Sequence, residues 1–151
     1  MDAREQRTEH DRWSSASIRI FGEKLQPEEV EAALALKATR THLKGQPRSP
    51  VQKTVWRETL WSLRSPLSPD RSVGDHLTWL LDRLEPKLDA IRALSADHRV
   101  DLFCGFSSGS GQGGFTLDPI ILVRLANLGV PLVLDLYPPG LEIDGTEVER
   151  E

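Results

Sequence analysis

One long stripe of apolar side chains constrains the fold of this sequence more than any other feature. Its members recur at spacings of four, three, four and three residues, at Leu77, Leu81, Leu84, Leu88 and Ile91. This spacing puts them on one side of an α-helix of about five turns, which must pack against another layer. Ser72 and Asp75 form a capping box at its start. Pro86 lies off the stripe, so we expect it to kink or divide the helix without disturbing the buried side.

Segments on both sides of this helix have the character of β-strands. We predict strands at 17–21, 55–64, 100–106 and 131–137, and a short strand with a long loop within 39–53. Two further helices are predicted at 26–36 and 118–128, each with a proline at its first position. This order indicates an α+β fold: a single mixed, mainly antiparallel sheet with helices packed on one face, an elaborated ferredoxin-like sandwich.

The 151 residues have the length of one domain. Residues 1–12 are charged and almost without apolar side chains, and residues 140–151 are acidic. We therefore expect a disordered charged tail at 1–12, a single domain at 13–139 and a flexible acidic tail at 140–151.

Charge and cysteine content favour a soluble cytoplasmic protein. The net charge of −4 makes general binding to nucleic acid unlikely. Cys104 is the single cysteine, so no internal disulfide can form, and no Cys or His pairs have the spacing of a zinc site. We find no secretory signal and no uninterrupted apolar span, and we expect no bound metal or cofactor.

A glycine-rich stretch, CGFSSGSGQGGFTL, follows the strand at 100–106. Gly109, Gly111 and Gly114 have the GxGxxG spacing of a dinucleotide site. That site needs a helix to begin at the last glycine, whereas the next helix has its own cap at Asp118 and its own proline at Pro119. We predict a mobile β-hairpin tip here, with arms at 100–106 and 113–117, and no bound nucleotide.

A basic segment is the clearest electrostatic feature. Between Ala32 and Arg57 there is no acidic residue, and the segment contains six cations: Lys37, Arg40, Lys44, Arg48, Lys53 and Arg57. One interpretation is a site for a small anionic or phosphate-bearing ligand or an acidic partner, with Trp56 able to stack. The other is a solvated loop that balances the acidic end of the chain.

One face of the predicted sheet is a second candidate site. Asp135 and Tyr137 share a face of the last strand. The alternate residues Leu132, Leu134 and Leu136 point to the other face, where we expect the helices. Arg19, Asp101 and a tryptophan could join them and bind a small polar ligand or a partner protein. The alternative is an ordinary solvated sheet face.

These two interpretations nominate five binding residues: Arg19, Lys44, Trp61, Asp135 and Tyr137. A binding module would expose an aromatic patch around Trp56 or Trp61. No catalytic residue is nominated. An enzyme would need His76, predicted to be a surface or partly packed side chain, to meet Asp135 and Tyr137 in one cleft, or Cys104, predicted to be inert in the core, to meet a histidine.

The chain resembles the bacterial domain-of-unknown-function 4279 family over about residues 16–137. The segments that carry the resemblance are SIRIFGEKLQPEEV, TRTHLKGQPRS, LWSLRSP, DHLTWLLDRLEPKLDAIRAL and VLDLY. The resemblance supports the fold and implies no activity; domains of this kind are often small accessory or immunity-like proteins. We therefore expect a protein-interaction or regulatory module, with an anion binder using residues 37–57 as the alternative and an enzyme as a weaker one.

Overall fold

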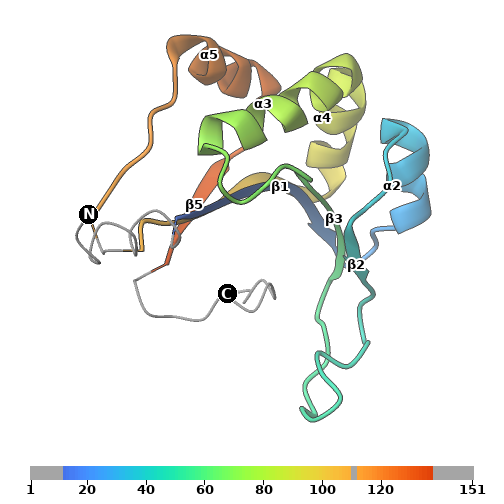
Figure 1. The fold of residues 1–151 in the computed structure, drawn as a ribbon. Coiled ribbons are helices and arrows are strands. Elements are labelled where there is room, and N and C mark those ends of the chain that lie inside the picture. Colours follow the sequence, from blue (N-terminus) through green and yellow to red (C-terminus); the bar gives the residue numbers. More distant parts are fainter. Residues whose placement is uncertain (1–11, 110–111, 138–151) are drawn as a thin grey trace.

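The computed structural model describes residues 12–109 and 112–137, and within them five strands form one sheet (Figure 1). The strands are β1 (Trp13–Gly22), β2 (Arg40–His42), β3 (Thr59–Arg64), β4 (Arg99–Ser107) and β5 (Leu132–Leu136), in the order β2-β3-β1-β4-β5. Neighbouring strands are antiparallel except β4 and β5, which are parallel. Apart from Arg12, the predicted tails at 1–12 and 140–151 lie outside the described residues.

The helices all lie on one side of this sheet (Figure 1). They are α2 (Pro27–Leu34), α3 (Val73–Leu84), the 3-10 turn η1 (Glu85–Lys87), α4 (Leu88–Asp97) and α5 (Pro119–Leu128). From β1 to β4 the elements follow the βαββαβ order of a ferredoxin-like fold, in which β3 lies between β1 and β2. The pair α5–β5 extends this unit beyond β4. The predicted α+β class and mixed sheet are confirmed.

The core lies between the sheet and the helices. Ile18 and Ile20 of the central strand β1 are fully buried there, opposite the apolar stripe of α3 and α4. Pro86 falls inside η1, which divides the long helix into α3 and α4 and leaves Leu84 and Ile91 buried on either side. The expected effect of this proline is therefore confirmed, because it interrupts the helix at an exposed position.

The glycine-rich stretch does not form the predicted hairpin. Of its residues, 110–111 lie outside the described part, and residues 112–118 contain no strand. Phe115 instead packs against Phe106 with ring centroids 5.2 Å apart, which carries the chain back toward the helices. The edge of β4 that is not paired with β1 pairs with β5 instead of with a hairpin arm. The helix does begin at Pro119 with Asp118 as its extended N-cap residue, as predicted.

The last strand is only partly covered. Leu132 packs against the core, as expected for a side chain that faces the helices, but Leu134 and Leu136 are 48% and 65% exposed. The physical reason is that α5 packs on α3 and does not extend over the edge of the sheet. Across the described ranges, no helix combines the length and apolar character needed to cross a bilayer.

Candidate binding face and arm

The side of the sheet opposite the helices carries arginines and aromatic rings. Alternation along β1, β3 and β4, together with the register of the strands, places these side chains on the same side. We call this surface the aromatic–arginine face and define it by Trp13, Arg19, Phe21, Arg64, Phe103 and Tyr137. Asp135 lies on the same side of β5, level with Gly105.

Arg19 at the centre of this face is held by Asp101, its direct neighbour across the strands. Its Nε and a terminal nitrogen donate to the two carboxylate oxygens of Asp101, both at 2.8 Å. The side chains are only 13% and 9% exposed, and the guanidinium carbon lies 4.1 Å from the ring centroid of Phe103. Arg19 therefore serves as a neutralised, rigid part of the face, because its charge is already satisfied.

Trp13 is the tryptophan that joins this face. Its ring lies over Gly105, where a Cβ atom would come within 2.5 Å of the ring. The ring centroid of Tyr137 lies 5.5 Å away in an edge-to-face arrangement, and the guanidinium carbon of Arg64 lies 5.5 Å from the Trp13 centroid. The sequence contains the signal for this placement, because Trp13 continues the alternation that runs back from Arg19 in steps of two.

The basic segment forms an arm that projects from the sheet away from the helices (Figure 1). We define the arm as residues 43–58, between β2 and β3. Backbone hydrogen bonds join its two sides: Gly45 N donates to Trp56 O at 2.8 Å, Trp56 N to Gln46 O at 2.9 Å, and Arg48 N to Thr54 O at 3.0 Å. The strand predicted at 55–64 consequently begins only at Thr59, since residues 55–58 belong to the arm.

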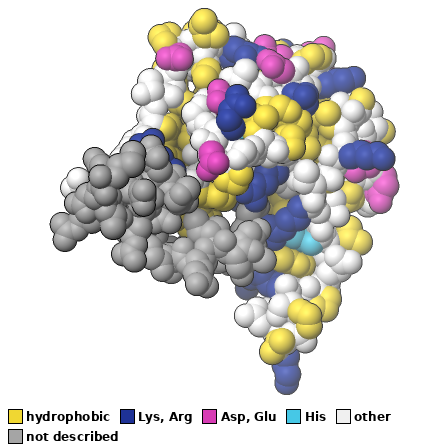
Figure 2. All heavy atoms as spheres, in the orientation of Figure 1, with side chains coloured by type: hydrophobic (Ala, Val, Ile, Leu, Met, Phe, Trp, Pro, Cys, Tyr) yellow, Lys and Arg dark blue, Asp and Glu magenta, His cyan; other side chains and the backbone are white. Residues whose placement is uncertain are grey.

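Cationic and aromatic groups stack at the base of the arm. The ring of Trp56 lies parallel to that of His42, with centroids 3.6 Å apart, and Arg48 covers Trp56 at 4.5 Å. Figure 2 shows dark blue Lys and Arg side chains, with a cyan histidine beside them, following the arm toward its tip. Val51 at the tip is 92% exposed and Val55 is 50% exposed. The arm thus presents cations and apolar side chains together.

Two of the predicted binding residues differ from the expectation. Trp61 lies away from both the face and the arm, and Lys44 already has an ionic partner. Trp61 is fully buried on the helix side of the sheet, so its expected exposure is wrong. The reason is the alternation of β3, which points Trp61 into the core beside Ile20. Trp56, in contrast, belongs to the arm. Lys44 lies on the arm, and its ammonium nitrogen is 3.2 Å from a carboxylate oxygen of Glu23.

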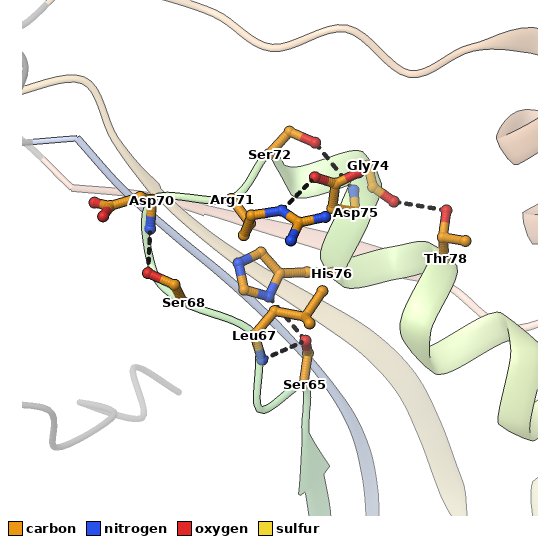
Figure 3. A network of polar contacts seen from close by, with 10 residues as sticks. All are labelled: Ser65, Leu67, Ser68, Asp70, Arg71, Ser72, Gly74, Asp75, His76 and Thr78. Atoms are coloured by element: carbon orange, nitrogen blue, oxygen red, sulfur yellow. Dashed lines mark hydrogen bonds and ion pairs between the residues drawn. The ribbon is translucent and has the colours of Figure 1, made fainter.

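His76 is buried, not partly exposed at the surface as predicted from the sequence. It is 1% exposed in the first turn of α3, and its Nδ1 lies 2.9 Å from the hydroxyl oxygen of Ser65 (Figure 3). The backbone N–H of Leu67 donates to the same hydroxyl oxygen at 3.3 Å, so the hydroxyl hydrogen is free to donate to a neutral imidazole. Beside it, Ser72 accepts the predicted cap bond from Asp75 N at 3.0 Å. His76 therefore joins the loop after β3 to the start of α3.

This burial makes stability depend on pH. Burial, followed by the nearby charge of Arg64, lowers the pKa of His76 below its ordinary 6.5. A hydrogen bond to the backbone of Ser68 raises this pKa and offsets only part of the effect. Above pH 6.5 the imidazole is neutral in both states; below it the unfolded chain binds the proton more readily. We expect the free energy of unfolding to fall by up to about 1.4 kcal/mol per pH unit below about pH 6.5.

Urea unfolding at several pH values between 7.5 and 5.5 checks this dependence, with His98→Gln, at a half-buried position, as the control. The His76→Gln protein should lose most of the slope, and the control should keep it. If His76→Gln does not fold, an NMR titration of the native protein provides the test. An imidazole of His76 that titrates at or above pH 6.5 would contradict the expectation.

The constellation of His76, Asp135 and Tyr137 considered from the sequence is not formed. His76 lies on the helix side of the sheet, whereas Asp135 and Tyr137 lie on the opposite side. Cys104 is buried, and desolvation raises the pKa of its thiol to about 12, which keeps it protonated and unreactive. Within residues 12–109 and 112–137, no three His, Cys, Asp or Glu side chains are grouped so that they could hold a metal ion.

An open hollow of about 500 Å³ lies at the other end of β1, lined among others by Lys24, Glu58, His98 and Arg99. His98 packs so closely on Gly22 that a Cβ atom at this glycine would lie 2.4 Å from its Nδ1. Arg99 and Glu58, which both line the hollow, form an ion pair at 3.2 Å. Sequence reasoning missed this site because its residues come from three separate segments.

Comparisons with known proteins give one result. No curated protein and no solved structure matches this chain. Residues 11–139 match the domain of unknown function DUF4279, and this range includes the aromatic–arginine face and the arm. Since the match covers most of the 151 residues, the chain belongs to the DUF4279 family.

Proposed function

We propose that this protein is an interaction module whose arm binds an acidic segment of a partner protein. The observation that carries the proposal is the arm itself: it projects from the sheet, is joined by backbone hydrogen bonds, and carries cations without a single acid before Glu58. An isolated loop that merely balances charge needs no such order. Cations on a pre-ordered arm lose less conformational freedom when they bind.

The apolar tip favours a protein over a small anion as the ligand. Val51 and Val55 are exposed beside the cations, and a phosphate group offers nothing to bury them. A small phosphate-bearing ligand remains the second candidate, supported by the position of Arg48 over the ring of Trp56, which also stacks on His42. We further propose that the module acts in the bacterial cytoplasm, where a free thiol such as Cys104 persists.

Two paired variants test the role of the arm. Arg48→Gln with Lys53→Gln removes two positive charges from the arm, and Lys87→Gln with Arg92→Gln removes two from η1 and α4. The probe is a synthetic peptide of alternating glutamate and leucine, compared with inorganic phosphate at equal charge. We expect the arm variant to bind the peptide roughly tenfold more weakly, since each lost ionic contact contributes about 0.5–1 kcal/mol. The control variant should bind unchanged.

A photocrosslinking amino acid placed at Val51 extends the test to the cell. The proposal expects one predominant crosslinked protein, identified by mass spectrometry, whose isolated acidic segment then binds the purified module. The same crosslinker at exposed Ala93 on α4 is the matched control. Thermal stabilisation by phosphate without any crosslink would favour the small-ligand candidate instead, and equal binding by both paired variants would remove the arm from the interaction.

A further inference from the structure

We infer that residues 140–151 of this same chain bind across the aromatic–arginine face, where they compete with an acidic partner. Charge, reach and position support docking of the segment, whereas the competition rests on the proposed function. The segment GLEIDGTEVERE contains five acids and one arginine, and its Leu141, Ile143 and Val148 alternate with the acids. It lies just beyond the range that matches the family.

The face offers a cation that the described residues leave without an ionic partner. Arg64 is half-buried against the ring of Trp13, and within the described ranges no carboxylate pairs with it. Arg40 lies on the same side of the neighbouring strand β2, two residues along. Arg48 follows on the arm, over Trp56. These three arginines form a row that leads from β3 across β2 to the arm.

The acidic segment begins within reach of this row. Tyr137 hydrogen-bonds through its N–H to the carbonyl of Phe106 and contacts Trp13, which in turn lies under Arg64. Tyr137 is separated from β3 by three strand spacings of about 4.8 Å, or roughly 14 Å. It lies level with Trp13, which is roughly 13 Å along β1 from Ser17, the partner of Arg64, so the direct separation is about 20 Å. Six extended residues span about 20 Å. Residues 138–143 therefore reach Arg64, and the acids beyond them can follow the row.

Side-chain chemistry matches as well as reach. Carboxylates that approach Arg64 and Arg40 meet guanidinium groups that can donate two hydrogen bonds each. The alternating Leu141 and Ile143 can lie on the half-buried rings of Trp13 and Tyr137. A second copy of the chain could supply the same segment in trans, and the test below separates this possibility by dilution.

A spin label on the full chain measures the contact directly. Glu149→Cys introduces a reactive thiol, and the native Cys104 is buried and does not compete for the label. The readout is the indole N–H signal of each tryptophan in the NMR spectrum, assigned by single Trp→Phe variants. We expect the Trp13 signal to be at least threefold weaker in the paramagnetic than in the reduced state, with Trp79 on the helix side unchanged.

Two further variants separate ionic docking from chance proximity. Glu142→Gln, Asp144→Asn and Glu147→Gln together should restore the Trp13 signal in the labelled protein, as should 1 M salt. Arg64→Gln should restore it at least in part. Ala93→Cys, labelled on α4, is the control that should leave Trp13 unaffected. The effect should not change on tenfold dilution, whereas a loss on dilution would assign the contact to a second copy and overturn the inference.

Equal broadening of Trp13 and Trp79, or none at Trp13, would also overturn it. The competition is then measured with the glutamate–leucine peptide, which should bind at least threefold more tightly when the acidic segment is neutralised. Docking without peptide binding would leave the contact standing and reject the proposed function. Peptide binding without docking would support the proposed function and reject the contact, so the two failures are distinguishable.

Discussion

Replacing Asp101 with alanine is expected to lower the free energy of unfolding by about 3–5 kcal/mol, although the residue lies outside the hydrophobic core. The change leaves Arg19, whose side chain is only 13% exposed in the native protein, without its two hydrogen bonds to Asp101. Water cannot fully replace the carboxylate there, because Phe103 covers one side of the group at 4.1 Å and Phe21 lies 5.0 Å away. Urea denaturation followed by tryptophan fluorescence measures the loss.

The double variant Arg19→Met with Asp101→Leu separates the value of the pair from the cost of breaking it. Both charges are then removed together, and apolar side chains of similar size replace them, so we expect stability near that of the native protein. Asp101→Ala costing less than about 1 kcal/mol would show that the guanidinium is solvated after all. A double variant as unstable as the single one would mean that the packing of this site, and not its charge, is decisive.

Truncating Trp61 to alanine is expected to cost about 3–5 kcal/mol in the free energy of unfolding. The ring is fully buried between β3 and the helices, so its removal leaves a cavity that the surrounding side chains fill only in part. Trp61→Phe should cost less, about 1–2 kcal/mol, because it keeps a ring. It also removes an indole N–H that has no hydrogen-bond partner among the described residues.

Val51→Ala is the matched control for this pair, because Val51 is 92% exposed at the tip of the arm. Its effect on stability should stay within about 0.5 kcal/mol. The two sites also separate stability from binding: Trp61→Phe should bind the acidic peptide normally, and Val51→Ala should weaken it. Weaker peptide binding by a folded Trp61→Phe protein would return Trp61 to the binding residues.

The elements with regular periodicity were predictable from the sequence. The stripe from Leu77 to Ile91 predicts one buried side for two helices, and Pro86 predicts the division between them, because each rests on local spacing. The shared face of Arg19, Asp101 and Tyr137 follows in the same way from alternation in steps of two. Local geometry decides all of these features, so the chain encodes them within a few neighbouring residues.

Features that depend on distant segments were not predictable. The arm has no periodic pattern, and only its cross-chain hydrogen bonds show that residues 55–58 leave the sheet. β4 pairs in parallel with β5, and helix α5 connects the two strands. The sequence favoured a local hairpin after β4 instead. The charged neighbours of His76 in the sequence suggest a surface position. The contact between its ring and the Ser65 hydroxyl forms only in the tertiary fold, so the local sequence does not reveal it.

The position of β1 in the sheet has a consequence for folding during synthesis. This strand leaves the ribosome before its neighbours, yet it lies in the middle of the sheet and pairs with β3 and β4. Arg19 and Asp101 are 82 residues apart, so roughly 4–16 s of translation separate them at about 5–20 residues per second. During that interval the nascent chain carries the apolar Ile18 and Ile20 without β4, one of the two strands that pair with β1. A chaperone that recognises short apolar segments would find this strand accessible during that time.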